Sequence, residues 1–304
     1  MSSRFRLDQE RDSQRRFAGR TLVLNFRWPD LFDHVGRRER EAGYAEEKTA
    51  ACSQSSDWSP LVQNTLWIGQ DQRRLICETS NGNYRVSISD VGRYHLGMDG
   101  RHICRLDPEA YAVSETLEHI VLVPVLCLAL ALRDAWCLHA SAVERGGRVT
   151  AFLGDSGAGK STLAGYLDLQ NHSGWQRIAD DVLPVELGKE SAVALPHFPQ
   201  LKLPVNEQVG EDCPQRLPLE AIYVIEASDH AVDVGWHPLD NKTATLALLS
   251  HTVAARLFDA NLLRRHLSFC VEVAACVPVR RLVYPHRLES LSAVQTLLEQ
   301  WLQP

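Results

Sequence analysis

The residues best suited to chemistry lie in a glycine-rich stretch near the middle of the chain. The stretch fits the pattern G-x-x-x-x-G-K-[ST] and consists of Gly154, Asp155, Ser156, Gly157, Ala158, Gly159, Lys160, Ser161 and Thr162. Its glycines let successive backbone N–H groups face one concavity, where phosphate oxygens can bind. Lys160 is placed to reach the β- and γ-phosphates, and the Ser161 hydroxyl can join the shell of a magnesium ion. The stretch therefore predicts a site for a nucleoside triphosphate, ATP, with Mg²⁺.

The residues on either side of this stretch favour the same interpretation. Residues 148–153 read as a strand that runs into the loop, and residues 161–168 are rich in helix formers. Leu163 and Leu167 are one helical turn apart. A helix that begins at the loop would point its free N–H groups at a bound phosphate. The alternative is a Gly/Ser-rich turn that fits the pattern by chance.

Carboxylates follow two of the later predicted strands. Asp180 and Asp181 end the strand predicted over 175–179. One carboxylate there could hold the metal, and the other could accept the proton of an attacking hydroxyl. Paired aspartates are also common in turns and caps. Glu226 ends the strand predicted over 219–225 and is a rival ligand for a metal or a hydrolytic water.

Two basic side chains are weaker candidates for the same site. His139 lies on a strand predicted over 138–143, just before the loop strand, and could approach the γ-phosphate. A lone histidine is more often a core residue with satisfied hydrogen bonds. Lys202 lies between two leucines in an extended segment over 196–204. It could bind phosphate or extend along the surface with its ammonium in water.

Three motifs in this order resemble the catalytic core of HPr kinase/phosphorylase and its relatives. They are Leu138-His-Ala-Ser-Ala-Val143, the glycine-rich stretch, and Gly174-Trp-Gln-Arg-Ile-Ala-Asp-Asp181. The resemblance covers residues 136–205 well and 219–285 loosely. It implies a P-loop fold related to PEP carboxykinase and an ATP- and magnesium-dependent phosphorylation of a serine hydroxyl in a protein or peptide. It also implies a base-like role for Asp180 and metal support from Asp181, and it makes His139 a stronger candidate for the site.

The sequence departs from that family after the aspartate pair. The family's Gly- and Arg-containing signature is absent, and Phe198-Pro-Gln-Leu-Lys-Leu203 stands roughly in its place. The later Arg-rich loop of the phosphorylase reaction has no match either, so the resemblance extends neither to HPr as acceptor nor to the reverse reaction. The pattern is more similar to divergent HPr kinase-like proteins. Some of these look like kinases that phosphorylate a serine of a ribosomal, lasso-type precursor peptide.

The elements that would position these residues fall into two parts. Residues 66–103 alternate as short strands, with turns at Asn81-Gly82-Asn83 and Asp99-Gly100, and predict an antiparallel layer. Residues 108–134 then become helical, and the second half is expected to be α/β. Its remaining elements are a helix over 246–267, a strand over 278–284 and a helix over 290–302. We expect an N-terminal β-rich module with a buried helix over 1–135, in which residues 21–26 could add a strand, and an HPr kinase-like P-loop catalytic domain over 136–304.

Composition narrows the class of protein. The chain has 304 residues, 45% hydrophobic and 23% charged, and a formal charge of −6, which argues against a nucleic-acid binder. Eight dispersed cysteines without a C-x-x-C pair favour a reducing cytosol. The polar start predicts no secretory signal, and the apolar run over 120–132 is shorter than the ~20 residues of a bilayer span. A cytoplasmic protein that binds no membrane is expected.

The expected partners are a nucleoside triphosphate and a peptide or protein acceptor with a serine. A homo-oligomer is compatible with the sequence. Two other functions use the same residues: a kinase for a small-molecule hydroxyl, and a nucleotide-binding regulatory protein or slow NTPase in which Glu226 orients water.

Overall fold

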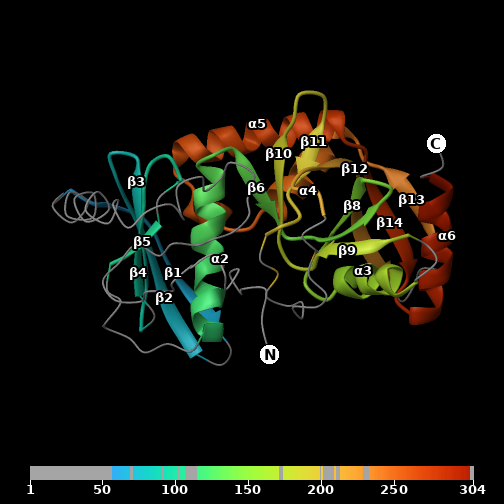
Figure 1. Cartoon of the computed structure of the whole chain (residues 1–304), viewed down its shortest axis with the longest axis horizontal. Coiled ribbons are helices and arrows are strands. Elements are labelled where there is room, and N and C mark those ends of the chain that lie inside the picture. Colours follow the sequence, from blue (N-terminus) through green and yellow to red (C-terminus); the bar gives the residue numbers. More distant parts are fainter. Residues whose placement is uncertain are drawn as a thin grey trace, which may run out of the picture. The chain divides into compact units, whose positions relative to one another are not determined.

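A computed structural model describes residues 57–68, 71–90, 92–101, 103–106, 115–170, 174–198, 200, 209, 213–228 and 233–301 (Figure 1). The chain divides into two compact units. The first contains the residues up to Arg133 together with Ala254–Leu262, and the second contains Asp134–Val253 and Leu263–Pro304. The sequence predicted a single boundary after residue 135. It did not predict that residues 254–262 belong to the first unit. The strand expected over 21–26 and the side chain of Lys202 lie outside the described residues.

The first unit contains an antiparallel sheet whose strands follow one another in chain order. These are β1 (Ser59–Ile68), β2 (Asp71–Ser80), β3 (Asn83–Ile88), β4 (Gly92–Leu96) and β5 (Ile103–Arg105). Asn81 and Gly82 have φ values of 51° and 79°, which is the backbone that a tight hairpin requires. The antiparallel layer predicted for this region is confirmed.

The first unit also contains a helix, α2 (Glu115–Ala131), which lies beside this sheet (Figure 1). Residues 125–131 are buried, as expected for the apolar run. Pro124 lies inside the helix and does not end it. No helix among the described residues is long and apolar enough to cross a membrane.

The second unit is α/β and is built on a curled nine-stranded sheet. Its strands are β6 (Ala135–Leu138), β7 (Ser141–Arg145), β8 (Arg148–Leu153), β9 (Gln176–Ala179), β10 (Leu183–Leu187), β11 (Ala192–Ala194), β12 (Leu217–Ser228), β13 (Gly235–Pro238) and β14 (Val279–Pro285). Strands β8, β12 and β14 are parallel, and β7 lies antiparallel between β8 and β9. The helices are α3 (Lys160–Leu169), α4 (Asn241–Ser250), α5 (Ala260–Cys276) and α6 (Leu291–Trp301), with short 3₁₀ turns η2 (Ala255–Leu257) and η3 (Leu288–Ser290).

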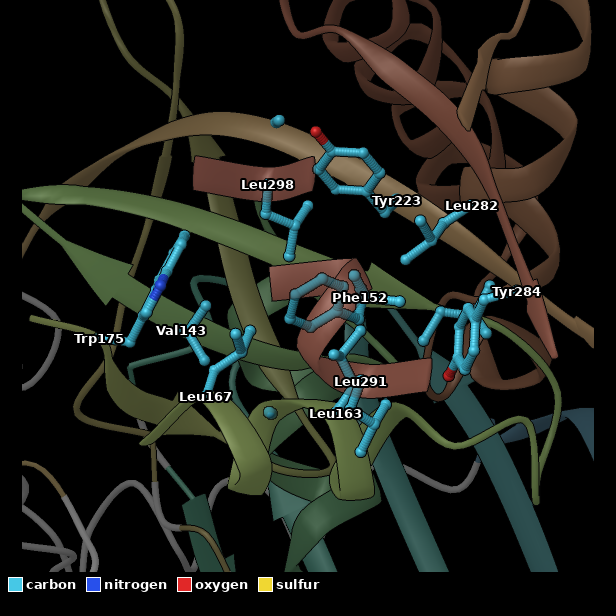
Figure 2. Packing of buried hydrophobic residues seen from close by; sticks show 14 residues of the cluster. Val143, Phe152, Leu163, Leu167, Trp175, Tyr223, Leu282, Tyr284, Leu291 and Leu298 are labelled. Carbon is cyan, nitrogen blue, oxygen red and sulfur yellow. The ribbon is translucent and has the colours of Figure 1, made fainter. Parts of the chain in front are cut away.

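The core of the second unit fixes α3 against the sheet. Leu163 and Leu167 of α3 are fully buried on the face that their spacing predicted. Figure 2 shows them beside Phe152 of β8 and Leu291 of α6, and all four belong to one hydrophobic cluster. Other members come from β7, β12, β14 and the residue before β9. The start of α3, where the glycine-rich loop ends, is therefore held by packing.

Two predicted elements are divided in the structure. The strand expected over 138–143 separates into β6 and β7 at His139 and Ala140, where the chain passes from one part of the sheet to another. The helix expected over 246–267 is wrong: α4 ends at Ser250 and α5 begins at Ala260. Between them the backbone of Thr252 bridges to Leu138, which competes with helical hydrogen bonding.

Capping side chains explain where the two helices begin. Asp240 accepts a hydrogen bond from the Thr243 N–H at 3.0 Å, and Asp259 accepts one from the Leu262 N–H at 2.8 Å. Side chains of this type satisfy N–H groups that a helix leaves open at its start. The short strands β10, β11 and β13 were not predicted either, and with 3 to 5 residues each they show little periodicity.

Candidate active site

The glycine-rich loop connects β8 to α3, in the strand–loop–helix order that the sequence predicted. Gly157 and Gly159 have φ values of 85° and 93°, a backbone that residues with a side chain rarely adopt. No side chain caps the first turn of α3, whose N-cap is Gly159. A Cβ atom at Gly157 would meet nothing within 4 Å. Within the described part of the chain, the start of α3 therefore has no side-chain cap and there is space beside Gly157, which suits an anion.

Lys160 is folded back over the beginning of the loop. Its side chain is buried, and Nζ donates to the carbonyl oxygens of Gly154 at 2.8 Å and Asp155 at 3.0 Å. These bonds compensate a cation that burial would otherwise penalise. Ser161 and Thr162 follow at the exposed start of α3. The ammonium group is therefore held at the loop, with a serine hydroxyl one residue away in sequence.

Asp180 enters the site through the register of β7 and β9. Ala142 pairs with Ala179, so the next residues outward, Ser141 and Asp180, come together. The Ser141 hydroxyl donates to Asp180 Oδ1 at 3.3 Å, and both side chains are buried. A buried carboxylate needs such donors. Because β9 ends at Ala179, strand alternation does not force Asp180 and Asp181 to opposite faces.

Gln200 holds the backbone of the aspartate pair. Its Oε1 accepts the N–H groups of Asp180 at 3.0 Å and Asp181 at 3.4 Å. Its Nε2 donates to the carbonyl oxygens of Val182 and Phe198 at 2.8 and 3.1 Å. Sequence reasoning missed this residue. The available signal was a single amide in the segment from Phe198 to Leu203, whose only other polar side chain is Lys202.

His139 lies between the loop and the aspartate pair. Its Nε2 is 3.4 Å from Asp181 Oδ1. Ser141 pairs with Phe152, and His139 precedes Ser141 by two residues, where the chain passes from β6 to β7. His139 lies at a bend and not on the strand predicted over 138–143, and its approach to the γ-phosphate stays a prediction.

One candidate from the sequence, Glu226, does not join this cluster. Glu226 lies within β12, two residues before its end; its side chain is largely exposed and lies 3.3 Å from Arg281. It alternates with Tyr223 and Ile225, which belong to the core cluster around α3, so it faces the other side of the sheet. Within the described ranges, no three His, Cys, Asp or Glu side chains gather as a metal site.

No family model matches the chain, and no curated protein matches it. Among solved structures, the Hpr(Ser) kinase/phosphatase from Coxiella burnetii is similar with a TM-score of 0.34 and 12% identity. That match covers 54% of this chain and 95% of the other. Function is therefore inferred from the residues and their geometry.

Proposed function

We propose that the chain transfers the terminal phosphate of a nucleoside triphosphate, ATP, to a hydroxyl group with the help of Mg²⁺. The observation that carries this proposal is one cluster at the ends of β8 and β9. It combines an uncapped glycine loop, a buried lysine on that loop, and a buried aspartate held by the Ser141 hydroxyl. A loop alone would suit any phosphate ligand. A buried carboxylate beside it adds a group that can act on a second substrate.

The loop residues and Lys160 would bind the donor. The N–H groups at the start of α3 would meet the phosphate oxygens, and the Lys160 ammonium would exchange its two carbonyl partners for the β- and γ-phosphates. Ser161 and Asp181 are the residues proposed to hold magnesium. Two protein ligands suffice for this ion because water and phosphate oxygens complete its shell. When bound, it would neutralise charge on the phosphates.

Asp180 is proposed as the base-like residue. A serine hydroxyl is a weak nucleophile at neutral pH, so a carboxylate that accepts its proton assists the attack. The transition state of phosphoryl transfer is loose, and orientation of the hydroxyl therefore counts at least as much as proton removal. The Ser141 hydroxyl and the Gln200 amide fix Asp180 from its side chain and its backbone. That support is what a positioning role requires.

The acceptor is proposed to be a serine of a peptide or protein. The support is the resemblance of the three motifs to HPr kinase-like proteins. The pattern is more similar to divergent members, some of which look like kinases of lasso-type precursor peptides. The N-terminal unit, with its antiparallel sheet, is proposed to contribute to acceptor binding, because loops on such a layer are suited to recognition. The proposed setting is the cytoplasm.

The test measures transfer from γ-labelled ATP with the full chain and Mg²⁺. Arrays of serine peptides, each matched by its alanine counterpart, would serve as acceptors, with small hydroxyl compounds in parallel. Lys160→Ala should reduce transfer at least ~10²-fold through loss of a preorganised charge. Asp180→Asn should reduce it ~10²–10⁴-fold and leave Mg–ATP affinity nearly unchanged. Asp181→Asn should weaken metal binding, with partial rescue by added magnesium.

Glu226→Gln is the matched control, because it removes a carboxylate near the same sheet but outside the cluster. It should leave transfer unchanged. The contrary result is ATP hydrolysis in the absence of any acceptor, abolished by Glu226→Gln but not by Asp180→Asn. This result would identify a water-activating NTPase and contradict the kinase assignment.

A further inference from the structure

A second histidine, His251, is brought to this site by the segment that separates α4 from α5. The His139 N–H donates to the His251 carbonyl oxygen at 2.6 Å, and the Val253 N–H donates to the Cys137 carbonyl oxygen at 2.7 Å. Leu138 and Thr252 form an antiparallel bridge between these bonds. His139 and His251 thus flank this bridge, and the bond from the His139 N–H brings their backbones together.

The backbone contact with His139 brings His251 close to the aspartate pair. The Nε2 atom of His139 is 3.4 Å from Asp181 Oδ1. His251 is half-buried, and the charges of Asp155 and Lys160 on the loop both act on it. His251 is therefore near the glycine loop as well as next to the backbone of His139.

Its protonation state at neutral pH suits a hydrogen-bond donor. Burial lowers the pKa of His251, Lys160 and His139 lower it further, and Asp155 opposes them. A neutral imidazole carries one N–H donor and one acceptor nitrogen. It can therefore donate to a phosphate oxygen without first adding a second buried cation next to Lys160.

The backbone that carries His251 is held firmly. The His251 N–H donates to the Ala247 carbonyl oxygen at 3.1 Å, which closes the end of α4. The Thr252 hydroxyl donates its single proton to the Leu248 carbonyl oxygen at 2.8 Å. In the 2.8 Å hydrogen bond between Thr252 Oγ1 and His266 Nε2, the histidine is therefore the donor. Trp136 of β6 packs against His266 with 5.0 Å between ring centroids and the ring planes tilted by 31°, which joins this support to the strand before His139.

We propose that His251 binds the terminal phosphate of the nucleoside triphosphate, as the partner of His139 across the mouth of the loop. This rests on the proposed nucleotide-dependent transfer and adds a phosphate-binding residue to it. A residue on the terminal phosphate should distinguish triphosphate from diphosphate. A residue that merely supports the fold should affect both nucleotides alike.

The test compares Mg–ATP and Mg–ADP affinities by calorimetry for the full chain and three variants. His251→Ala should weaken Mg–ATP binding roughly 10–100-fold, the range for one hydrogen bond to a charged group, and change Mg–ADP binding less than about 2-fold. His251→Gln keeps an amide donor and should recover part of the loss. His237→Gln, at an exposed histidine of β13, should change neither affinity.

A second measurement needs no substitution. In the wild-type chain labelled at its histidine rings, the NMR signals of His251 should shift with Mg–ATP and remain nearly still with Mg–ADP. If wild-type protein binds neither nucleotide, the proposed function itself is wrong and this inference with it. If wild type binds both nucleotides and His251→Ala loses them equally or keeps both, only the role of His251 is overturned.

Discussion

Two glycines of the loop have similar backbones but different surroundings, and alanine at each separates stability from binding. Both have φ near 90°, so an alanine Cβ costs about 1–2 kcal/mol of backbone strain at either position. At Gly157 the new Cβ meets nothing within 4 Å, whereas at Gly159 it lies 3.0 Å from the buried Tyr284 hydroxyl. Overpacking adds about 1–3 kcal/mol. Gly159→Ala should therefore cost about 2–5 kcal/mol in total.

The assay is urea unfolding followed by tryptophan emission, because Trp175 is buried in the core beside α3. Gly159→Ala combined with Tyr284→Phe should regain the overpacking part, since the clashing oxygen is gone. A double-mutant cycle isolates that pairwise energy. Equal stability losses at the two glycines, or no coupling between Gly159→Ala and Tyr284→Phe, would refute the reasoning.

Binding should rank the two variants in the opposite order. The Cβ of Gly157→Ala points into the open side of the loop, where the phosphate is proposed to lie, so Mg–ATP affinity should fall although the fold loses little. Calorimetry with Mg–ATP on the same samples checks this. Wild-type affinity in Gly157→Ala would show that the phosphate does not occupy that space.

Three further predictions concern groups around the site and between the helices. Burial lowers the pKa of His266 to about 4 from 6.5, so the unfolded chain takes up a proton first as pH falls. The free energy of unfolding should drop by about 3 kcal/mol from pH 6.5 to 4, and His266→Gln should lose this part of the slope in urea titrations at each pH. Asp259 caps α5 and accepts the Tyr84 hydroxyl at 2.7 Å. Asp259→Ala should lower the free energy of unfolding by about 1–3 kcal/mol in the same urea assay. The loss should be smaller when the substitution is made in the Tyr84→Phe background. Ser141→Ala should lower phosphoryl transfer ~10-fold at unchanged Mg–ATP affinity, since it removes the donor that orients Asp180; wild-type turnover would contradict this.

The parts of the site that the sequence could predict are those fixed by local chemistry. Glycines before a lysine, between an apolar strand and a helix-forming run, specify their own backbone, and the loop follows β8 as expected. The aspartate pair was located because a short apolar strand ends there. Such signals need only neighbours in the chain.

The parts that could not be predicted depend on contacts between distant segments. Residues 246–267 have helical composition throughout, yet the Thr252 backbone pairs with Leu138 and Asp259 caps a new helix. Tertiary hydrogen bonds outweigh the weak propensity of a few residues. The break delivers His251, so the error in secondary structure and the missed site residue have one cause. Gln200 was missed similarly, because its four backbone partners come from two separate segments.

The strand directions explain why these groups meet at one edge of the sheet. Strands β8 and β9 both run antiparallel to β7, so their carboxyl ends lie together, where β7 begins. The glycine loop follows β8, Asp180 follows β9, and Ser141 opens β7. His139, two residues earlier, lies where the chain leaves β6. Because side chains alternate, a shift of β7 by one residue would turn Ser141 away from Asp180. The chemistry proposed here therefore depends on the register of a single five-residue strand.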